Sequence, residues 1–182
     1  MSVLYDQIFL DTKKIIKKYK TRDPREILEA KGVFLIPFKS PTKVLGMYKI
    51  IKKNRFVFYN PHLSDPLVNM VLAHELGHDI YHKDELSYQM AEYELFDIRT
   101  DMEIEANIFA AHLLINEETL LEDLKLGYTY NQLASLYEVN ANLMIFKLNE
   151  MHRMGMPIRQ NEADPKFFAQ IDGNIEEDYY NY

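Results

Sequence analysis

The sequence of 182 residues contains no cysteine. It can therefore form no disulfide bond and no thiolate metal site, and it offers no cysteine nucleophile. No apolar stretch approaches the roughly 20 residues that a membrane-spanning helix needs. The first 20 residues alternate apolar side chains with lysines, which is unlike a signal peptide. We therefore expect a cytoplasmic protein that does not engage a membrane.

The overall composition is that of a globular protein, with 47% hydrophobic and 27% charged residues. A chain of this size can bury a full core without a metal ion to hold it together. Its charge is unevenly distributed. Residues 1–60 carry 14 basic and 5 acidic side chains, residues 61–158 carry 5 and 17, and residues 159–182 carry 2 and 6. The basic first third could attract nucleic acid, but we interpret its lysines as solvating a helix and a small sheet.

The hydrophobic pattern predicts an α+β fold, in which a small antiparallel or mixed three-stranded sheet precedes a mainly helical body. Strands are expected at residues 33–38, 44–51 and 55–59, with a hairpin turn at 52–54. Helices are expected at residues 3–20, from Asp23-Pro24 to Gly32, from Asp65-Pro66 to about His82, and at 101–115, 117–126, 130–138 and 140–152. Thr100 and Glu103 have the spacing of a capping box at the start of the helix at 101–115.

The sequence His74-Glu75-Leu76-Gly77-His78 is an H-E-x-x-H motif within the helix expected to end near His82. Residues four apart lie on one face of a helix, so the two imidazoles can bind the same Zn²⁺ ion. Glu75 is rotated away from that direction and can take a proton from a water molecule that the zinc activates. The motif therefore predicts a catalytic zinc site with Glu75 as general base.

A catalytic zinc site has three protein ligands, and the third is not part of this motif. The extended motif with a third histidine would need Gly at 81 and His at 84, where this chain has Tyr81 and Asp84. The acidic candidates further along are Glu92, Glu94, Asp97, Asp101, Glu103 and Glu105. Asp101 and Glu103 lie in a first helical turn, where acids are favoured by free N–H groups alone. Glu105 has apolar helical neighbours and would be costly unless it bound a metal, so we predict Glu105 as the third ligand.

The H-E-x-x-H motif, the segment Glu103-Ile104-Glu105-Ala106-Asn107-Ile108-Phe109-Ala110-Ala111 and the pair Leu113-Leu114 together resemble the ImmA/IrrE family of bacterial and phage metallopeptidases. The resemblance extends from about Pro24 to Met154. It implies a zinc endopeptidase with a zincin-like fold, with His74, His78 and Glu105 as ligands and Glu75 as general base or acid. It also implies a protein substrate, typically a repressor-type transcription factor of a mobile element or a stress response.

In thermolysin-like enzymes an aspartate four residues after the ligand glutamate orients a zinc histidine. The corresponding residue here is Phe109, so we consider Asp101 and Asp79 as alternatives for this role.

His82 lies one turn beyond His78, and we interpret it as a cationic imidazole at a helix end. His112 and Tyr81 could stabilise an oxyanion, although a solvated surface position is the simpler interpretation for His112.

We expect three regions: a zincin-like domain at 1–126, a helix-turn-helix-like segment at 127–156 packed on it, and an acidic tail at 157–182. The second helix of the middle segment offers only Lys147 and Arg153 as cations, so direct nucleic-acid binding is not expected. The leading function is zinc-dependent cleavage of a cytoplasmic regulator. The alternatives are a non-catalytic module that inactivates a regulator by contact and, less favoured, a DNA-binding regulator.

Overall fold

The computed structural model describes residues 2–83, 100–156 and 158. In chain order its elements are α1 (Ser2–Tyr19), α2 (Pro24–Ala30), β1 (Val33–Pro37), β2 (Gly46–Ile51), β3 (Asn54–Tyr59), α3 (Asp65–Tyr81), α4 (Asp101–Leu114), α5 (Glu117–Lys125), α6 (Tyr130–Leu136) and α7 (Ala141–Arg153). This confirms the predicted α+β class, and the described elements lie within about two residues of their expected bounds. The tail predicted from residue 157 lies outside the described residues apart from Ile158.

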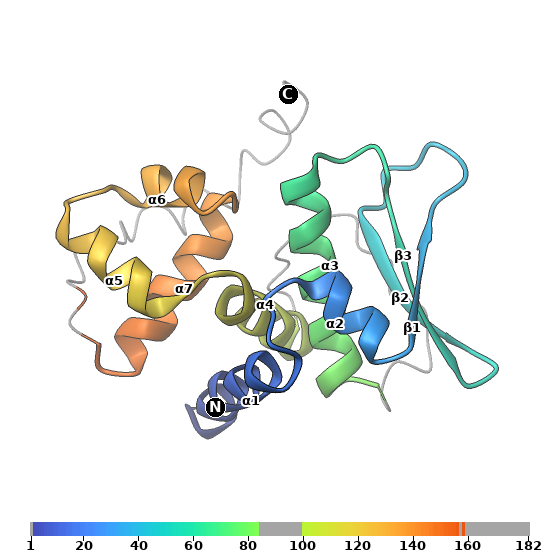
Figure 1. The fold of residues 1–182 in the computed structure, drawn as a ribbon, viewed down its shortest axis with the longest axis horizontal. Helices are drawn as coiled ribbons and strands as arrows, with labels where there is room; N and C mark the ends of the chain where they lie inside the picture. The colour runs from blue at the N-terminus through green and yellow to red at the C-terminus, as the bar shows by residue number, and fades with distance from the viewer. Residues whose placement is uncertain (1, 84–99, 157, 159–182) are drawn as a thin grey trace.

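The sheet has the strand order β1-β3-β2, with β1 parallel and β2 antiparallel to β3. Lys52 and Lys53 form a two-residue hairpin loop between β2 and β3, and both have positive φ. Such a loop matches the right-handed twist of the two strands. Figure 1 shows α2 and α3 on one side of this sheet. The sheet is therefore mixed, and β2 lies at its edge.

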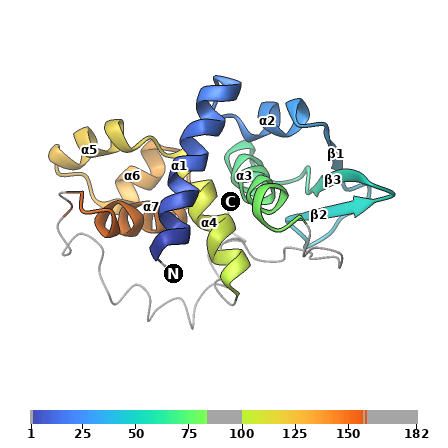
Figure 2. The ribbon, with the colours of Figure 1, turned by 90° about the horizontal axis from the view of Figure 1, so that it is seen from below.

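Two helices, α3 and α4, form the centre of the molecule. Both are apolar on most sides, because α3 also packs against α2 and the sheet, and α4 also packs against α1 and α7. Figure 2 shows α1 and α4 crossing the middle of the protein, between the sheet and the group formed by α5, α6 and α7. The centre of the molecule is thus the contact between α3 and α4.

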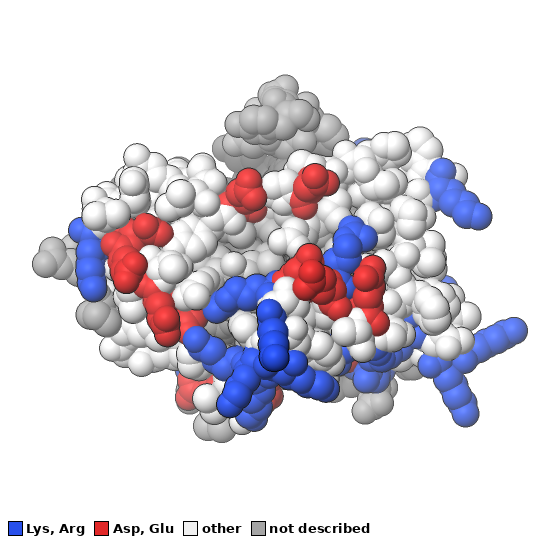
Figure 3. Space-filling model, in the orientation of Figure 1, with Lys and Arg blue, Asp and Glu red and all other residues white. Residues whose placement is uncertain are grey.

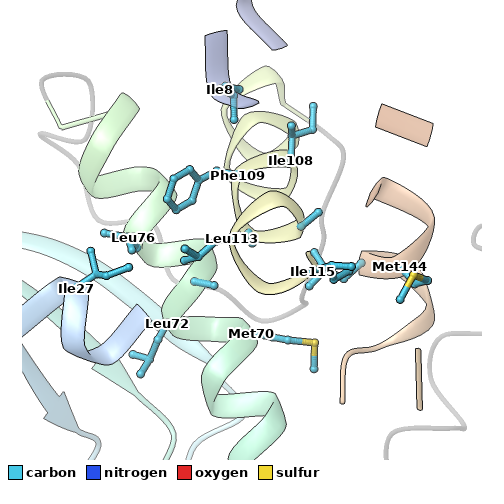
Figure 4. Packing of buried hydrophobic residues seen from close by; sticks show 14 of the residues in the cluster. Ile8, Ile27, Met70, Leu72, Leu76, Ile108, Phe109, Leu113, Ile115 and Met144 are labelled. Carbon is cyan, nitrogen blue, oxygen red and sulfur yellow. The ribbon is translucent and has the colours of Figure 1, made fainter. Parts of the chain in front are cut away.

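Gly77 of α3 permits the close approach of these two helices. A Cβ atom at this position would lie 2.9 Å from the Cα atom of Ala106 in α4. Leu72 and Leu76 of α3 belong to the same buried core as Phe109 and Leu113 of α4 (Figure 4). The two helices are therefore fixed in distance and in register at the level of the H-E-x-x-H motif.

The helices after α4 pack onto it through α7, whose Leu143, Met144 and Leu148 are buried. Lys147 is also fully buried, so it is not available to a phosphate backbone. Figure 3 shows lysines and arginines gathered over the part of the surface that α1 occupies, in keeping with its basic sequence. None of the described helices is both long and apolar enough to cross a membrane.

Candidate metal centre

The H-E-x-x-H motif lies in the second half of α3, as predicted, and its two histidines point toward α4. His74 and His78 are each only 1% exposed, and their Nε2 atoms are 3.0 Å apart. The four-residue spacing places both rings on the same face of the helix. The structure therefore brings the two histidines of the motif together.

Glu103, and not Glu105, is the acidic side chain that meets the two histidines. A carboxylate oxygen of Glu103 lies 3.1 Å from Nε2 of His74, and the other lies 3.5 Å from Nε2 of His78. Glu105 instead lies 3.0 Å from Nε2 of His82. Apolar sequence neighbours led to the choice of Glu105. They do not distinguish Glu105 from Glu103 on a helix that is surrounded by protein on most sides.

The capping-box expectation for α4 is only half confirmed. The Thr100 side chain accepts a hydrogen bond from the backbone N–H of Glu103, as a capping residue should. The Glu103 side chain, in contrast, is directed to the histidines and is 2% exposed. The sequence indicates helix capping as the role of Glu103, whereas in the structure its side chain lies in the buried cluster with His74 and His78.

The three side chains fit a metal ion. Ligand atoms about 2.0–2.1 Å from a tetrahedral zinc ion are separated from one another by about 3.3 Å. The separations observed here, 3.0, 3.1 and 3.5 Å, lie around that value. Neither carboxylate oxygen of Glu103 has a hydrogen-bond partner of proper geometry, although both are buried. A buried carboxylate in this state is costly unless a cation compensates it, so the group His74, His78 and Glu103 could hold a metal ion.

The electrostatics of the cluster also suit a metal. Burial is the main cause that lowers the pKa of His78 to about 4, since Glu103 raises it and the neighbouring histidines lower it, so its imidazole is neutral near pH 7. Burial alone would raise the pKa of Glu103, but the adjacent rings of His74 and His78 lower it below its usual range. Neutral imidazoles and an ionised carboxylate are the forms that bind a metal.

Asn107 is a site residue that the sequence reasoning missed. Its Oδ1 lies 2.8 Å from Nδ1 of His74, and the side chain is fully buried. An acceptor at Nδ1 keeps the proton there and leaves the Nε2 lone pair directed at the cluster. Asn107 follows Glu103 by four residues, which is the spacing expected between a ligand glutamate and an orienting residue. The same spacing counted from Glu105 leads to Phe109 instead.

Glu75 lies between the two histidines in sequence and is 1% exposed. Gly46, the first residue of the edge strand β2, faces it. A Cβ atom at Gly46 would lie 2.7 Å from Oε1 of Glu75 and 2.5 Å from Cγ1 of Val71. The position of the Glu75 carboxylate is thus defined on one side by strand β2.

Asp79 and Asp101 do not orient the histidines as we had considered. Asp79 is fully buried, and it accepts hydrogen bonds from Tyr48 and Arg55 and pairs with Lys31. It therefore fastens α3 to the sheet. Asp101 is exposed at the start of α4.

His112 and Tyr81 have surroundings different from those expected for an oxyanion site. His112 is 2% exposed, so it is not a solvated surface residue. Its Nδ1 lies 3.2 Å from Nζ of Lys147, and its ring contacts Phe9. The Tyr81 ring packs against Phe109, and its hydroxyl has no hydrogen-bond partner among the described residues. The structure places His112 with α1 and α7, and it leaves the role of Tyr81 as a prediction.

His82 lies at the end of α3, as predicted, and it is buried there, with only 2% of its surface exposed. Its Nδ1 lies 2.9 Å from Nδ1 of His78, and its Nε2 contacts Glu105. Both ring nitrogens therefore have partners: Nδ1 contacts His78 of the buried cluster, and Nε2 contacts Glu105 outside it.

Comparison with known proteins places the chain in a family. Residues 28–149 match the Peptidase_M78 family model, which is described as the IrrE N-terminal-like domain. The chain is also 31% identical over 143 residues to a Bacillus phage phi105 protein described as an uncharacterized immunity region protein 2, an alignment that covers 79% of this chain and 90% of that protein. With the buried histidine and glutamate cluster in the matched region, the chain belongs to the Peptidase_M78, or ImmA/IrrE, family.

Proposed function

We propose that this protein is a zinc-dependent endopeptidase that cleaves a regulatory protein, a repressor of the helix-turn-helix type. The observation that supports this most directly is the spacing of the three donor atoms of His74, His78 and Glu103, with Glu75 in the same turn of α3. These three residues are the proposed ligands. A catalytic site keeps one coordination position open for water or substrate, whereas structural zinc usually has four protein ligands.

When bound, a zinc ion supplies Lewis acidity that polarises the peptide carbonyl and lowers the pKa of water. The protein presents the Nε2 atoms of both imidazoles, and burial keeps the ring of His78 neutral. Asn107 keeps the proton of His74 at Nδ1. Glu75 takes a proton from the attacking water as the new C–O bond forms, and its carboxyl group then delivers a proton to the amine nitrogen as the C–N bond breaks.

The choice of a regulator as substrate rests on the family and on the printed description of the phage relative as an immunity region protein. In such families the partner is a repressor-type transcription factor. We therefore propose that the substrate to test is a helix-turn-helix protein, if one is encoded beside the gene for this chain.

The test compares wild-type protein with Glu75→Gln, Glu103→Ala and Glu105→Ala variants, purified without chelator. We expect one zinc per chain in the wild type and in Glu75→Gln, and a large loss of zinc in Glu103→Ala. Cleavage of the regulator should be absent in Glu75→Gln. Zinc retention in Glu103→Ala together with its loss in Glu105→Ala would contradict the proposed ligand set.

The same variants separate cleavage from inactivation by contact. If Glu75→Gln still relieves repression in cells while the regulator stays intact, the protein acts as a binding module and the peptidase proposal is wrong. The regulator's length on a denaturing gel and a reporter for its target promoter give the two readouts independently.

A further inference from the structure

His82 and Glu105 form a buried chain of contacts that begins at a proposed metal ligand. The His78 Nδ1 atom lies 2.9 Å from Nδ1 of His82, and Nε2 of His82 lies 3.0 Å from Oε2 of Glu105. The His82 side chain is 3% exposed and that of Glu105 is 14% exposed. His82 follows His78 by one helical turn, so α3 itself places the two rings side by side.

Only one arrangement of protons satisfies every contact in this chain when both rings are neutral. If Nε2 of His78 keeps its lone pair for a metal, its proton must be on Nδ1, from which it is donated to Nδ1 of His82. His82 then carries its own proton on Nε2 and donates it to the Glu105 carboxylate. A carboxylate at the far end favours this direction over the opposite one, because an ionised carboxylate can only accept.

We propose that His82 and Glu105 are positioning residues that fix the tautomer and the ring orientation of His78, as Asn107 does for His74. This inference rests on the proposed function, since it assigns a role at the same metal site. The two ligand histidines are then held in different ways, one by a neutral amide and the other by an imidazole backed by a carboxylate.

The geometry also distinguishes this role from direct metal binding by His82. A ligand needs a free nitrogen lone pair directed at the ion. Nδ1 of His82 is occupied by His78, and Nε2 is occupied by Glu105. Loss of His82 should therefore weaken the metal site without removing a ligand. Groups in this position typically contribute 10- to 100-fold to metal affinity.

The experiment measures zinc affinity of the full-length protein by competition with a chromophoric chelator. Variants are His82→Phe, which keeps the ring volume, and His82→Gln, which keeps hydrogen-bonding capacity. We expect His82→Phe to weaken zinc binding about 10- to 100-fold, and His82→Gln to weaken it less. His62→Phe, in the exposed loop before α3, is the matched control and should bind zinc like the wild type.

Glu105 is tested on the same scale. Glu105→Gln keeps an acceptor for the His82 N–H, so it should lose less affinity than Glu105→Leu. The control is Asp101→Asn, which removes a negative charge from an exposed position of the same helix. Equal losses in Glu105→Leu and Asp101→Asn would mean that only net charge matters, and this would overturn the assignment.

Two readouts distinguish the positioning role of His82 from a merely structural one. The metal-free variants should unfold at the wild-type temperature within a few degrees. In ¹⁵N-labelled, zinc-loaded wild type, the His78 ring should show a slowly exchanging proton on Nδ1, and this signal should disappear in His82→Phe. If His82→Phe binds zinc within twofold of the wild type while Glu103→Ala does not bind it, the positioning role is wrong and the ligand set stands. If Glu103→Ala also binds zinc normally, the ligand set itself is wrong.

Discussion

Replacing Gly77 by alanine tests whether the contact between α3 and α4 sets the geometry of the metal site. The new Cβ atom would lie 2.9 Å from Cα of Ala106, 3.2 Å from its carbonyl oxygen and 3.3 Å from its Cβ. The first two of these atoms are backbone atoms, which cannot rotate away. The helices must therefore separate or slide, and His74 and His78 must move relative to Glu103.

Two opposing contributions decide the stability of Gly77→Ala. Alanine is favoured over glycine inside a helix by about 1 kcal/mol. Overpacking of a close contact costs about 1–3 kcal/mol. The expected result is a net loss of about 1 kcal/mol in the free energy of unfolding. The effect on zinc affinity should be larger. Glu103 lies 3.1 and 3.5 Å from the two histidines, and moving the helices apart would take its carboxylate out of reach of an ion bound to both.

The assay is urea unfolding of the metal-free protein together with zinc affinity by chelator competition. The control is Gly127→Ala, at which no atom lies within 4 Å of the new Cβ but φ is +82°. That variant should lose stability through backbone strain alone and should keep its zinc affinity. Adding Ala106→Gly to Gly77→Ala should restore only part of the loss, since it removes the Cβ contact and leaves the backbone contacts. A Gly77→Ala protein that is more stable than wild type, with unchanged zinc affinity, would refute the reasoning.

Four further predictions use other contacts of the site and its supports. Gly46→Ala should displace the Glu75 carboxylate, so that zinc content stays near wild type while peptide cleavage falls, as measured on the regulator. Asn107→Leu should weaken zinc affinity about 10- to 100-fold in the chelator assay. Asp79→Asn should lower the free energy of unfolding by about 2–4 kcal/mol in urea, because it leaves the half-buried Lys31 and Arg55 without their counter-charge. Burial and, to a smaller extent, the positive charge of the nearby Lys147 lower the pKa of His112 to about 2. The unfolded chain therefore binds a proton below about pH 6.5 that the folded chain does not. Stability should fall with acidification by up to about 1.4 kcal/mol per pH unit, and His112→Phe should remove that part of the slope.

The helix that carries the motif was predictable because its evidence is local. The four-residue spacing of His74 and His78 fixes a common face whatever surrounds the helix. The small sheet was predictable for a similar reason, since three short apolar runs with a two-lysine turn leave few alternatives. The parallel pairing of β1 with β3 depends on contacts distant in sequence, and the pattern left it open.

The third ligand could not be chosen from apolar neighbours. That argument assumes that a helix has one apolar face, so that a carboxylate among apolar residues stands out. On α4 most faces are covered, by α1, α3 and α7. Glu103 and Glu105 therefore both lie beside apolar residues, and the first-turn position of Glu103 made capping a sufficient explanation for it. What separates the two glutamates is which one faces His74 and His78, and that depends on how the helices are packed.

The spacing from Glu103 to Asn107 is the feature that could have indicated from sequence which glutamate meets the two histidines. Two residues four apart on α4 face two histidines four apart on α3, so that Glu103 meets the Nε2 atoms and Asn107 meets Nδ1 of His74. Ala106 lies against Gly77 between these contacts and sets the distance of the two helices. The requirement for a small residue at 77 and at 106 follows from the cluster of His74, His78 and Glu103 as much as from the core, because any larger side chain there would separate the side chains that the two helices bring together.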